Sequence, residues 1–330
     1  MEQSGKKFFL KILSLLIISI VLTGWIKQAQ SQEKYPTRPI EIICPYSPGA
    51  TNDFAARITA DYLKKKWGVP VNVVNKPGGN TIPANVELYR AAPDGYTVLC
   101  DQRESSVMLE ITEKNLPFRV FDRTWIGTIQ ATAMMFILPA NSHYKSFDDV
   151  VADIKKDPGN FTWTSFGGSG AADSCFRSLF KAIGVDVHRT RPVVCEGGAK
   201  CTAMTAGGHV KMGSAGTGVA TIGAVESGLV RALAMLGTRY GGYPQLVSTS
   251  ELGYPGVTWD GWTGFSGPPK MPSHVVDIWN KALKEMSEDP EVKSRFMLGK
   301  VVVAFRSALE MKEKATKDLK EAAELYPPTR

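Results

Sequence analysis

Short apolar runs alternate with segments of helical periodicity along residues 35–100. Residues 40–44 and 69–74 are mostly apolar, which is typical of buried strands. Residues 54–66 carry Phe54, Ile58 and Leu63 at helical spacing, and a second helix is expected at 83–91 before a strand at 96–100. Strand, helix, strand, helix, strand at this spacing predicts parallel βαβ units.

The same alternation returns after residue 132 and gives way to a helical tail. The expected strands are 133–139, 161–165, 191–194, 230–236 and 259–266, and the expected helices are 146–155, 171–183, one after Gly197-Gly198, 272–289, 292–298 and 308–326. Ser146, followed by two acidic residues, is expected to cap its helix. The chain is therefore predicted to be α/β, with two successive α/β units and a helical end.

The N-terminus has the layout of a secretory signal peptide. Three lysines (Lys6, Lys7 and Lys11) precede an apolar run over 12–22, and Ala29-Gln30-Ser31 places small residues before a cut after Ser31. The alternative is an uncleaved anchor, but the run is too short to span ~30 Å of hydrocarbon as a helix. We expect residues 1–31 to be removed and the mature protein to be exported.

Composition and charge narrow the class of partner. Hydrophobic residues make up 43% and charged residues 22% of the 330, as in an ordinary globular protein. Residues 1–31 contain four Lys and one Glu, so their removal lowers the formal charge from +7 to +4. This mild excess suits anions but is too weak to indicate a nucleic-acid partner.

The cysteines are few and show no metal-site spacing. They are Cys44, Cys100, Cys175, Cys195 and Cys201, which matches no zinc pattern, so we expect neither a metal nor a cofactor. Export permits disulfides. Either Cys195 pairs with Cys201, or the cysteines are buried free thiols.

Two loops rich in Gly, Ser and Thr follow strands and lead into helices: residues 45–53 and 165–174. In open α/β sheets, ligands sit outside the carboxyl ends of strands, at such loops. Backbone N–H groups and the helix dipole favour an anion there. Each of the two loops is therefore a candidate anion site.

Several motifs occur in an order that resembles a known family. They are Tyr35-Pro36-x-Arg38-Pro39-Ile40, Pro45-Tyr46-x-Pro48-Gly49-x-x-x-Asp53, Asn75-Lys76-Pro77-Gly78-Gly79-Asn80, Ala92-Pro93-Asp94-Gly95-Tyr96-Thr97, Leu116-Pro117-Phe118, residues 161–170, Gly197-Gly198-Ala199, Gly207-Gly208-His209-Val210, residues 228–234 and Asp289-Pro290-Glu291-Val292. Over residues 35–326 the chain resembles the Bug family, the periplasmic substrate-binding subunits of tripartite tricarboxylate transporters.

The resemblance implies a two-domain periplasmic-binding-protein fold of the Venus flytrap, type II-like kind. Domain 1 would comprise residues 35–136 and return as 261–330 with the C-terminal helices, and domain 2 would comprise 137–260. The protein would be a monomeric, non-enzymatic receptor that binds a small organic carboxylate. It would deliver that ligand to the membrane permease subunits of such a transporter.

The resemblance also implies the ligand-binding residues. Carried over to this chain they are Ser47, Gly49, Ala50, Thr51 and Asp53 in the first loop and Gly168, Ser169, Gly170, Ala171 and Ala172 in the second. To these we add Gln102 and Arg103, after the third strand. The chain departs from the family pattern at Ala50, at Asp101-Gln102-Arg103, at Cys195-Glu196 and over residues 211–215, so the ligand is not transferable from any one relative.

Several of these side chains have two readings. Arg103 could pair with a ligand carboxylate, or form a salt bridge with Glu104 or Asp101. Asp53 could orient its loop, but helix capping is the more usual role. Lys211 could line the cleft or be solvated.

Three aromatic residues, Trp259, Trp262 and Phe265, could line a hinge or pocket, although core packing is the common fate of such side chains.

Two other functions are weighed against the receptor. Gly167 to Ala171 resembles a degenerate nucleophile elbow, but none of the four histidines shows a motif that ties it to Ser169, which disfavours an exported hydrolase. Neither a P-loop nor a dinucleotide-binding motif occurs. The other alternative is a sensory module that presents its ligand to a receptor kinase.

Overall fold

The computed structural model describes residues 34–168, 170–195 and 197–326. The chain divides into a unit up to Thr37 and a unit from Arg38 onward. In the first unit the Tyr35–Pro36 peptide bond is cis. The predicted signal peptide, residues 1–31, lies outside the described residues. Within the described ranges, no helix has both the length and the apolar character needed to cross a membrane.

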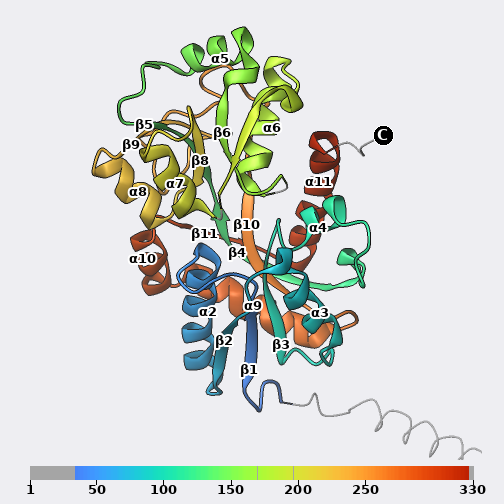
Figure 1. Ribbon diagram of the computed structural model, residues 1–330. Helices are drawn as coiled ribbons and strands as arrows, with labels where there is room; N and C mark the ends of the chain where they lie inside the picture. The colour runs from blue at the N-terminus through green and yellow to red at the C-terminus, as the bar shows by residue number, and fades with distance from the viewer. Residues whose placement is uncertain (1–33, 169, 196, 327–330) are drawn as a thin grey trace, which may run out of the picture. The chain divides into compact units, whose positions relative to one another are not determined.

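Six strands from both ends of the larger unit form one sheet (Figure 1). In order across the sheet they are β11 (Val302–Arg306), β4 (Thr124–Thr132), β10 (Gly261–Gly267), β3 (Thr97–Gln102), β1 (Ile40–Cys44) and β2 (Val71–Asn75). β1 is parallel to both β2 and β3, which confirms the predicted βαβ units. β10 is antiparallel to β3 and β4, and β11 is antiparallel to β4.

Helices cover both faces of this sheet. On one side lie α2 (Thr51–Trp67), α9 (Ser273–Glu288) and α10 (Pro290–Leu298), and on the other lie α3 (Ile82–Arg90), α4 (Val107–Thr112) and α11 (Ala308–Leu325). Successive residues of β3 contact the helices on opposite faces, because side chains alternate between the two faces along a strand. The Cys100 thiol contacts the carbonyl of Asn52 in α2, whereas Asp101 faces the side of α3.

The residues between β4 and β10 form two smaller sheets. Antiparallel β8 (Gly213–Gly216), β5 (Met134–Pro139) and β9 (Val230–Met235) make one, and parallel β6 (Thr162–Ser165) and β7 (Arg191–Val194) make the other. Their helices are α5 (Phe147–Lys156), α6 (Ala171–Ile183), α7 (Gly198–Ala206) and α8 (Val219–Glu226). The helix at 171–183 and the strand at 191–194 have the bounds that their periodicity predicted.

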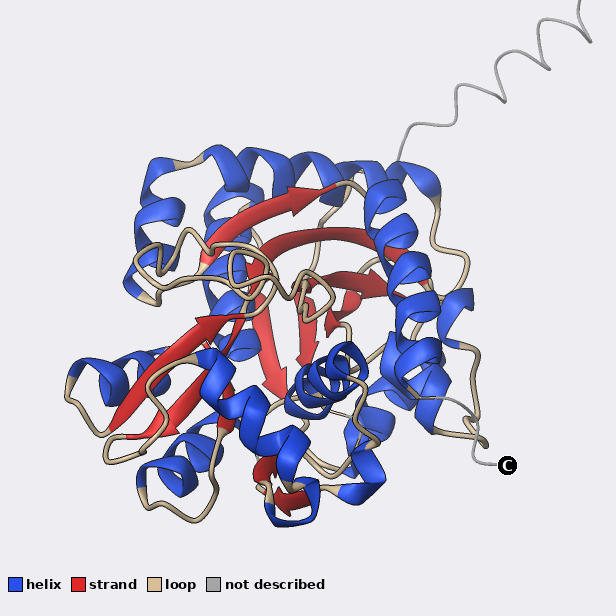
Figure 2. Cartoon of the chain, turned by 90° about the horizontal axis from the view of Figure 1, so that it is seen from above, coloured by secondary structure: helices blue, strands red, loops and turns tan. Residues whose placement is uncertain are grey.

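β5 is buried on both faces, which explains its unbroken apolar run. Phe136 and Leu138 pack with the aromatic residues of α5 and α6, while Met135 and Ile137 pack toward α7 and α8. Figure 2 shows helices around these strands as well as around the larger sheet. The predicted cap is confirmed, since Ser146 and Asp149 form a reciprocal capping box at the start of α5.

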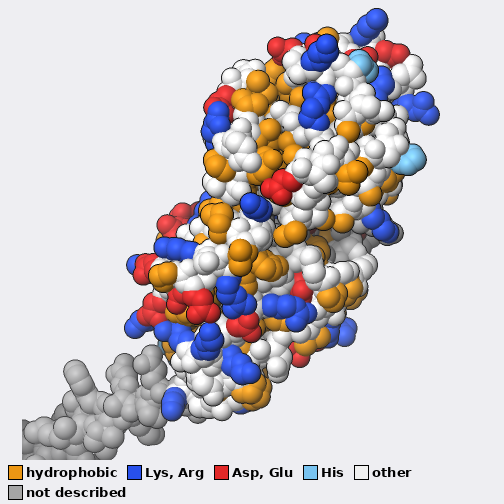
Figure 3. Space-filling view, turned by 90° about the vertical axis from the view of Figure 1, so that its left-hand side faces the viewer, with side chains coloured by type: hydrophobic (Ala, Val, Ile, Leu, Met, Phe, Trp, Pro, Cys, Tyr) orange, Lys and Arg blue, Asp and Glu red, His pale blue; other side chains and the backbone are white. Residues whose placement is uncertain are grey.

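We call the six-stranded sheet with its helices, described residues 38–132 and 261–326, the first lobe, and described residues 133–260 the second lobe. The domain boundaries themselves stay a prediction. The lobes touch beyond their two chain connections: the hydroxyl of Tyr326, which follows α11, lies 3.1 Å from Ser174 Oγ in α6. On the face seen in Figure 3, basic and acidic side chains are interspersed and do not gather into a basic surface.

Candidate functional site: two acid-organised loops between the lobes

The first candidate loop is held by one buried carboxylate. Asp53 Oδ2 accepts hydrogen bonds from the Gly49 N–H and from Arg57 Nε, both at 2.9 Å, and Oδ1 accepts one from Asn75 Nδ2 at 2.8 Å. Gly49 has φ +82°, which favours glycine. Burial alone would raise the pKa of Asp53, but the hydrogen bonds from Arg57, Gly49 and Asn75 outweigh it and hold that pKa below its usual value.

The expectation that Asp53 caps α2 is wrong. The N-cap of α2 is Ala50, which receives no side-chain cap, and Asp53 lies three residues later. Its carboxylate reaches back over the helix start to the loop. Asp53 therefore orients the loop, the alternative that capping statistics had disfavoured.

The second candidate loop is built in the same way. Asp173, again the third residue of its helix, is buried and accepts hydrogen bonds from the N–H groups of Phe166, Gly168 and Gly170 at 2.9, 3.0 and 3.1 Å. Its Oδ1 also accepts from Ser165 Oγ. Asp173 was not among the predicted site residues, although an acidic residue at the third helical position after a Gly-rich loop is a recognisable sequence signal. Ser169, predicted to bind ligand, lies outside the described residues.

This arrangement decides which N–H groups remain for a ligand. Gly49, Gly168 and Gly170 donate to the two aspartates, so their N–H groups are engaged. The first N–H groups of a helix have no acceptor within it. Those of Thr51 and Asn52 in α2, and of Ala171 and Ala172 in α6, donate no hydrogen bond within the described part of the chain.

The two lobes approach each other at the start of α2. A Cβ placed on Gly218, just before α8, would lie 3.5 Å from Thr51 Oγ1. Thr51 and Ala50 are half-buried there, whereas Ser47 and Gly49 are exposed. The predicted residues of the first loop therefore stand beside the second lobe.

Arg103 links the loop after β3 to the second lobe. It is 5% exposed, its Nη1 donates to Ser174 Oγ at 3.3 Å, and its guanidinium carbon lies 4.9 Å from the Trp259 ring centroid. Among the described residues it forms no salt bridge with Glu104 or Asp101, so that alternative is wrong. Gln102, beside it, is fixed through its own N–H, which donates to Ser105 Oγ and Asp101 Oδ1.

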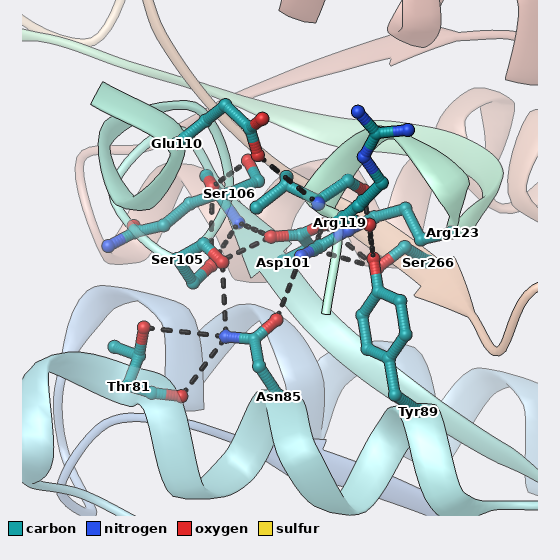
Figure 4. Close-up of polar contacts among 12 residues, drawn as sticks. Thr81, Asn85, Tyr89, Asp101, Ser105, Ser106, Glu110, Arg119, Arg123 and Ser266 are labelled. Atoms are coloured by element: carbon teal, nitrogen blue, oxygen red, sulfur yellow. Dashed lines mark hydrogen bonds and ion pairs between the residues drawn. The ribbon is translucent and has the colours of Figure 1, made fainter. Parts of the chain in front are cut away.

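Asp101 belongs instead to a buried network on the far face of the sheet (Figure 4). It forms a fully buried ion pair with Arg123, and it accepts hydrogen bonds from Ser105 and Ser266. Arg123 also donates to Asn85 Oδ1 at 2.8 Å. The departure from the family pattern at Asp101 is thus explained by structure rather than by ligand contact.

Comparison with known proteins identifies the chain at the level of the family. The family model described as "Tripartite tricarboxylate transporter family receptor" matches residues 55–324. The chain belongs to this family. A relative from Cupriavidus necator, described as "UPF0065 protein in gbd 5'region", is 29% identical to this receptor over 299 residues, which cover 87% of this chain and 89% of that protein.

Three solved structures share the receptor's fold, and each is matched over 88% of this chain. Periplasmic binding protein BugD has a TM-score of 0.74 at 24% identity, with 97% of its chain covered. MatC from Rhodopseudomonas palustris with bound malate has a TM-score of 0.76 at 19% identity, with 100% of its chain covered. R. palustris Rpa4515 with adipate has a TM-score of 0.78 at 17% identity, with 97% of its chain covered.

These findings confirm the recognition of the Bug-type family, the periplasmic-binding-protein fold and the function of a solute receptor. Family and fold are those of solute-binding receptors rather than of enzymes. They favour neither the hydrolase nor the sensory module.

The structure also gives the contacts of Lys211 and of the three aromatic residues whose roles the sequence left open. Lys211 pairs with Asp153 at 2.8 Å, and its side chain stays 33% exposed, so it is a partly solvated member of a surface ion pair. Trp262 and Phe265 are core residues, as expected, and the Trp262 indole donates to Asp318. Trp259 is also buried but presents its ring to Arg103.

The cysteines and histidines are the side chains of the receptor that were considered for disulfide, metal or catalytic chemistry. Cys195 and Cys201 form a disulfide, with their Cα atoms 5.5 Å apart, while the other three cysteines are free and buried. No cluster of metal-ligating side chains is found among the described residues. No hydrogen bond in the described ranges joins a histidine side chain to a serine hydroxyl.

Proposed function

We propose that this receptor grips one carboxylate of a small organic acid between the starts of α2 and α6. The observation that carries the proposal is the matched construction of the two loops. In each, a buried aspartate at the third helical residue fixes the loop, and the first N–H groups of the helix are left to donate. The positive end of each helix dipole adds to the attraction. Two relatives of the same fold hold dicarboxylates, malate and adipate.

In this proposal the predicted site residues take different parts. Thr51, Ala171 and Ala172 donate backbone N–H groups to the carboxylate. Arg103 supplies a buried cation close to Ser174 of the second lobe.

The remaining residues shape the site. Asp53 is not a ligand contact but the group that holds Ser47, Gly49 and Ala50 in place, as Asp173 does for Gly168 and Gly170. Gln102 stands at the carboxyl end of β3, beside Arg103.

The family and the sequence of the N-terminus support a place of action outside the cytoplasm. After removal of residues 1–31, the receptor would work in the periplasm as a monomer. It would hand its ligand to the permease subunits of a tripartite tricarboxylate transporter, for which its family is the receptor. Closure of two lobes around a ligand is the usual mechanism of periplasmic binding proteins.

Proline substitution at the first helical residue tests the backbone donors directly. Proline is tolerated there because that N–H has no helical acceptor, and Gly170, with φ −81° and ψ −176°, has the extended backbone that must precede it. Ala171→Pro should weaken binding of organic acids by roughly 10- to 150-fold, the value of one hydrogen bond to a charged group.

The matched control is Ala308→Pro, at the first residue of α11, away from both loops. Calorimetry with a panel of organic acids and their amide analogues should show acids bound, amides rejected, and the control unchanged. Equal binding of an acid and its amide, or unchanged affinity in Ala171→Pro, would contradict the proposal.

A further inference from the structure

Gln130 is a buried amide in the six-stranded sheet that has no hydrogen-bond partner among the described residues. It lies in β4, its side chain is 0% exposed, and neither Nε2 nor Oε1 makes a hydrogen bond within the described part of the chain. Thr128, two residues earlier, is equally buried, but its hydroxyl donates to the carbonyl of Ala304 at 3.0 Å. A buried polar group is normally paired, so an unpaired amide here needs an explanation.

The strand register places Gln130 in a row of polar side chains. It lies opposite Thr263 of β10, which in turn lies opposite Gln102 of β3. Opposed residues share a face of a sheet, and this is the face covered by α2. Asn52, the second residue of α2, reaches Thr263 Oγ1 with its Nδ2 at 3.5 Å. The row therefore runs beneath the first turn of α2, where the carboxylate is proposed to bind.

The same end of β4 meets the second lobe. The carbonyl of Ala131 accepts a hydrogen bond from the hydroxyl of Tyr240 in the second lobe at 3.2 Å. Within the second lobe, the carbonyl of Ala133, directly after β4, accepts one from the Thr217 N–H at 3.2 Å. Gly218, next to Thr217, is the residue that approaches Thr51. Gln130 thus lies next to Ala131, whose carbonyl contacts the second lobe, and opposite Thr263, which the start of α2 contacts.

The chemistry of the row is neutral. Gln130, Thr263, Asn52 and Gln102 offer amide and hydroxyl groups, which both donate and accept hydrogen bonds, and none carries a charge. A second carboxylate would find no cation among them, whereas a hydroxyl or carboxamide would satisfy both kinds of atom at once. An apolar group would leave the Gln130 amide unpaired.

We propose that Gln130, with Thr263 and Asn52, forms a second, uncharged subsite that selects carboxylates bearing a hydroxyl or carboxamide group. The inference rests on the proposed function, since it concerns the far end of the same ligand. It narrows the substrate class from organic acids in general to acids with one neutral hydrogen-bonding substituent.

The test compares matched acids on the mature receptor. Calorimetry is run with ω-hydroxy acids, ω-carboxamide acids and unsubstituted alkanoates at each chain length from three to six carbons. The wild type should prefer a substituted acid over its alkanoate by about 10-fold or more, because a site built for a polar group rejects the analogue that lacks it. Gln130→Met should abolish this preference by weakening the substituted acids, and it should not weaken alkanoate binding, because the variant has no amide left unpaired.

Thr128→Val is the matched control, because it removes a buried polar group from the same strand. It should keep the preference, and the unliganded Gln130→Met protein should not melt at a lower temperature than the wild type. The inference is overturned by three results: no preference in the wild type, a Gln130→Met variant that weakens all acids equally, or a lowered melting temperature of that variant. Binding of no acid at all by the wild type would instead refute the proposed function.

Discussion

Arg103 in the first lobe and Ser174 in the second are joined by a hydrogen bond of 3.3 Å from Nη1 to Oγ. Ser174 Oγ also lies 3.1 Å from the hydroxyl of Tyr326, so this side chain contacts two separate segments of the first lobe. The Arg103 guanidinium is buried against Trp259 and forms no salt bridge among the described residues. A buried guanidinium that forms no salt bridge among the described residues is placed to receive an anionic ligand.

Arg103 and its partner should therefore differ in their effect on binding. Arg103→Met removes the cation and should weaken carboxylate binding by roughly 10- to 150-fold, since a hydrogen bond to a charged group is lost. Ser174→Ala removes only the contact between lobes and should change affinity by less than about 3-fold. Calorimetry on both variants checks this, and equal losses would show that Arg103 acts by joining the lobes.

Asp53 should give the receptor an acid-sensitive loop. Its pKa is lowered in the folded state, so its charge stabilises the fold above the ordinary aspartate pKa of about 3.9, and that stabilisation is lost as the pH falls through the folded value. Asp53→Asn should lower the free energy of unfolding at pH 7 by ~1.5–3 kcal/mol. Urea unfolding should show this deficit shrinking below about pH 4.

A control on the same helix separates loop organisation from general charge effects. Asp61 is exposed and pairs at the surface with Arg295, so Asp61→Asn should cost less than about 1 kcal/mol at any pH. A deficit in Asp53→Asn that stays constant down to about pH 3, below the ordinary aspartate pKa, would contradict the role assigned to its charge.

The buried ion pair between Asp101 and Arg123 should be intolerant of single substitutions. Arg123→Met leaves a buried carboxylate without its cation and should lower the free energy of unfolding by ~3–5 kcal/mol, as should Asp101→Leu. The double variant should be less destabilised than the sum of the two, because it leaves no lone charge. Strict additivity in a double-mutant cycle by urea unfolding would show that the pair is not coupled.

The thiol count should report the disulfide. The folded receptor should show no reactive thiol, because Cys44, Cys100 and Cys175 are buried, and burial raises the pKa of Cys175 to about 12. Three thiols should react after denaturation without a reductant, and five after reduction. Five reactive thiols in the unreduced, denatured protein would rule out the Cys195–Cys201 bridge.

Local pattern was sufficient for much of the fold. β1, α2, β2, α3 and β3 lie within three residues of the segments that their periodicity predicted, because each buries a face defined by neighbours in the sequence. The order of the sequence motifs was sufficient to predict the family to which the chain belongs. The two candidate loops, residues 45–53 and 165–174, were found from sequence because turn residues between a strand and a helix are a local signal.

Other features were decided only by the tertiary structure. β4 carries Thr128 and Gln130 at buried positions, so its sequence does not look like a central strand, and only its antiparallel neighbours β10 and β11 make it one. The partners of Asp101 and Arg103 are likewise far away in the sequence, at Arg123 and Ser174. A sequence records which side chains can pair, but pairing inside a folded protein depends on which groups the fold brings within about 3 Å and shields from water.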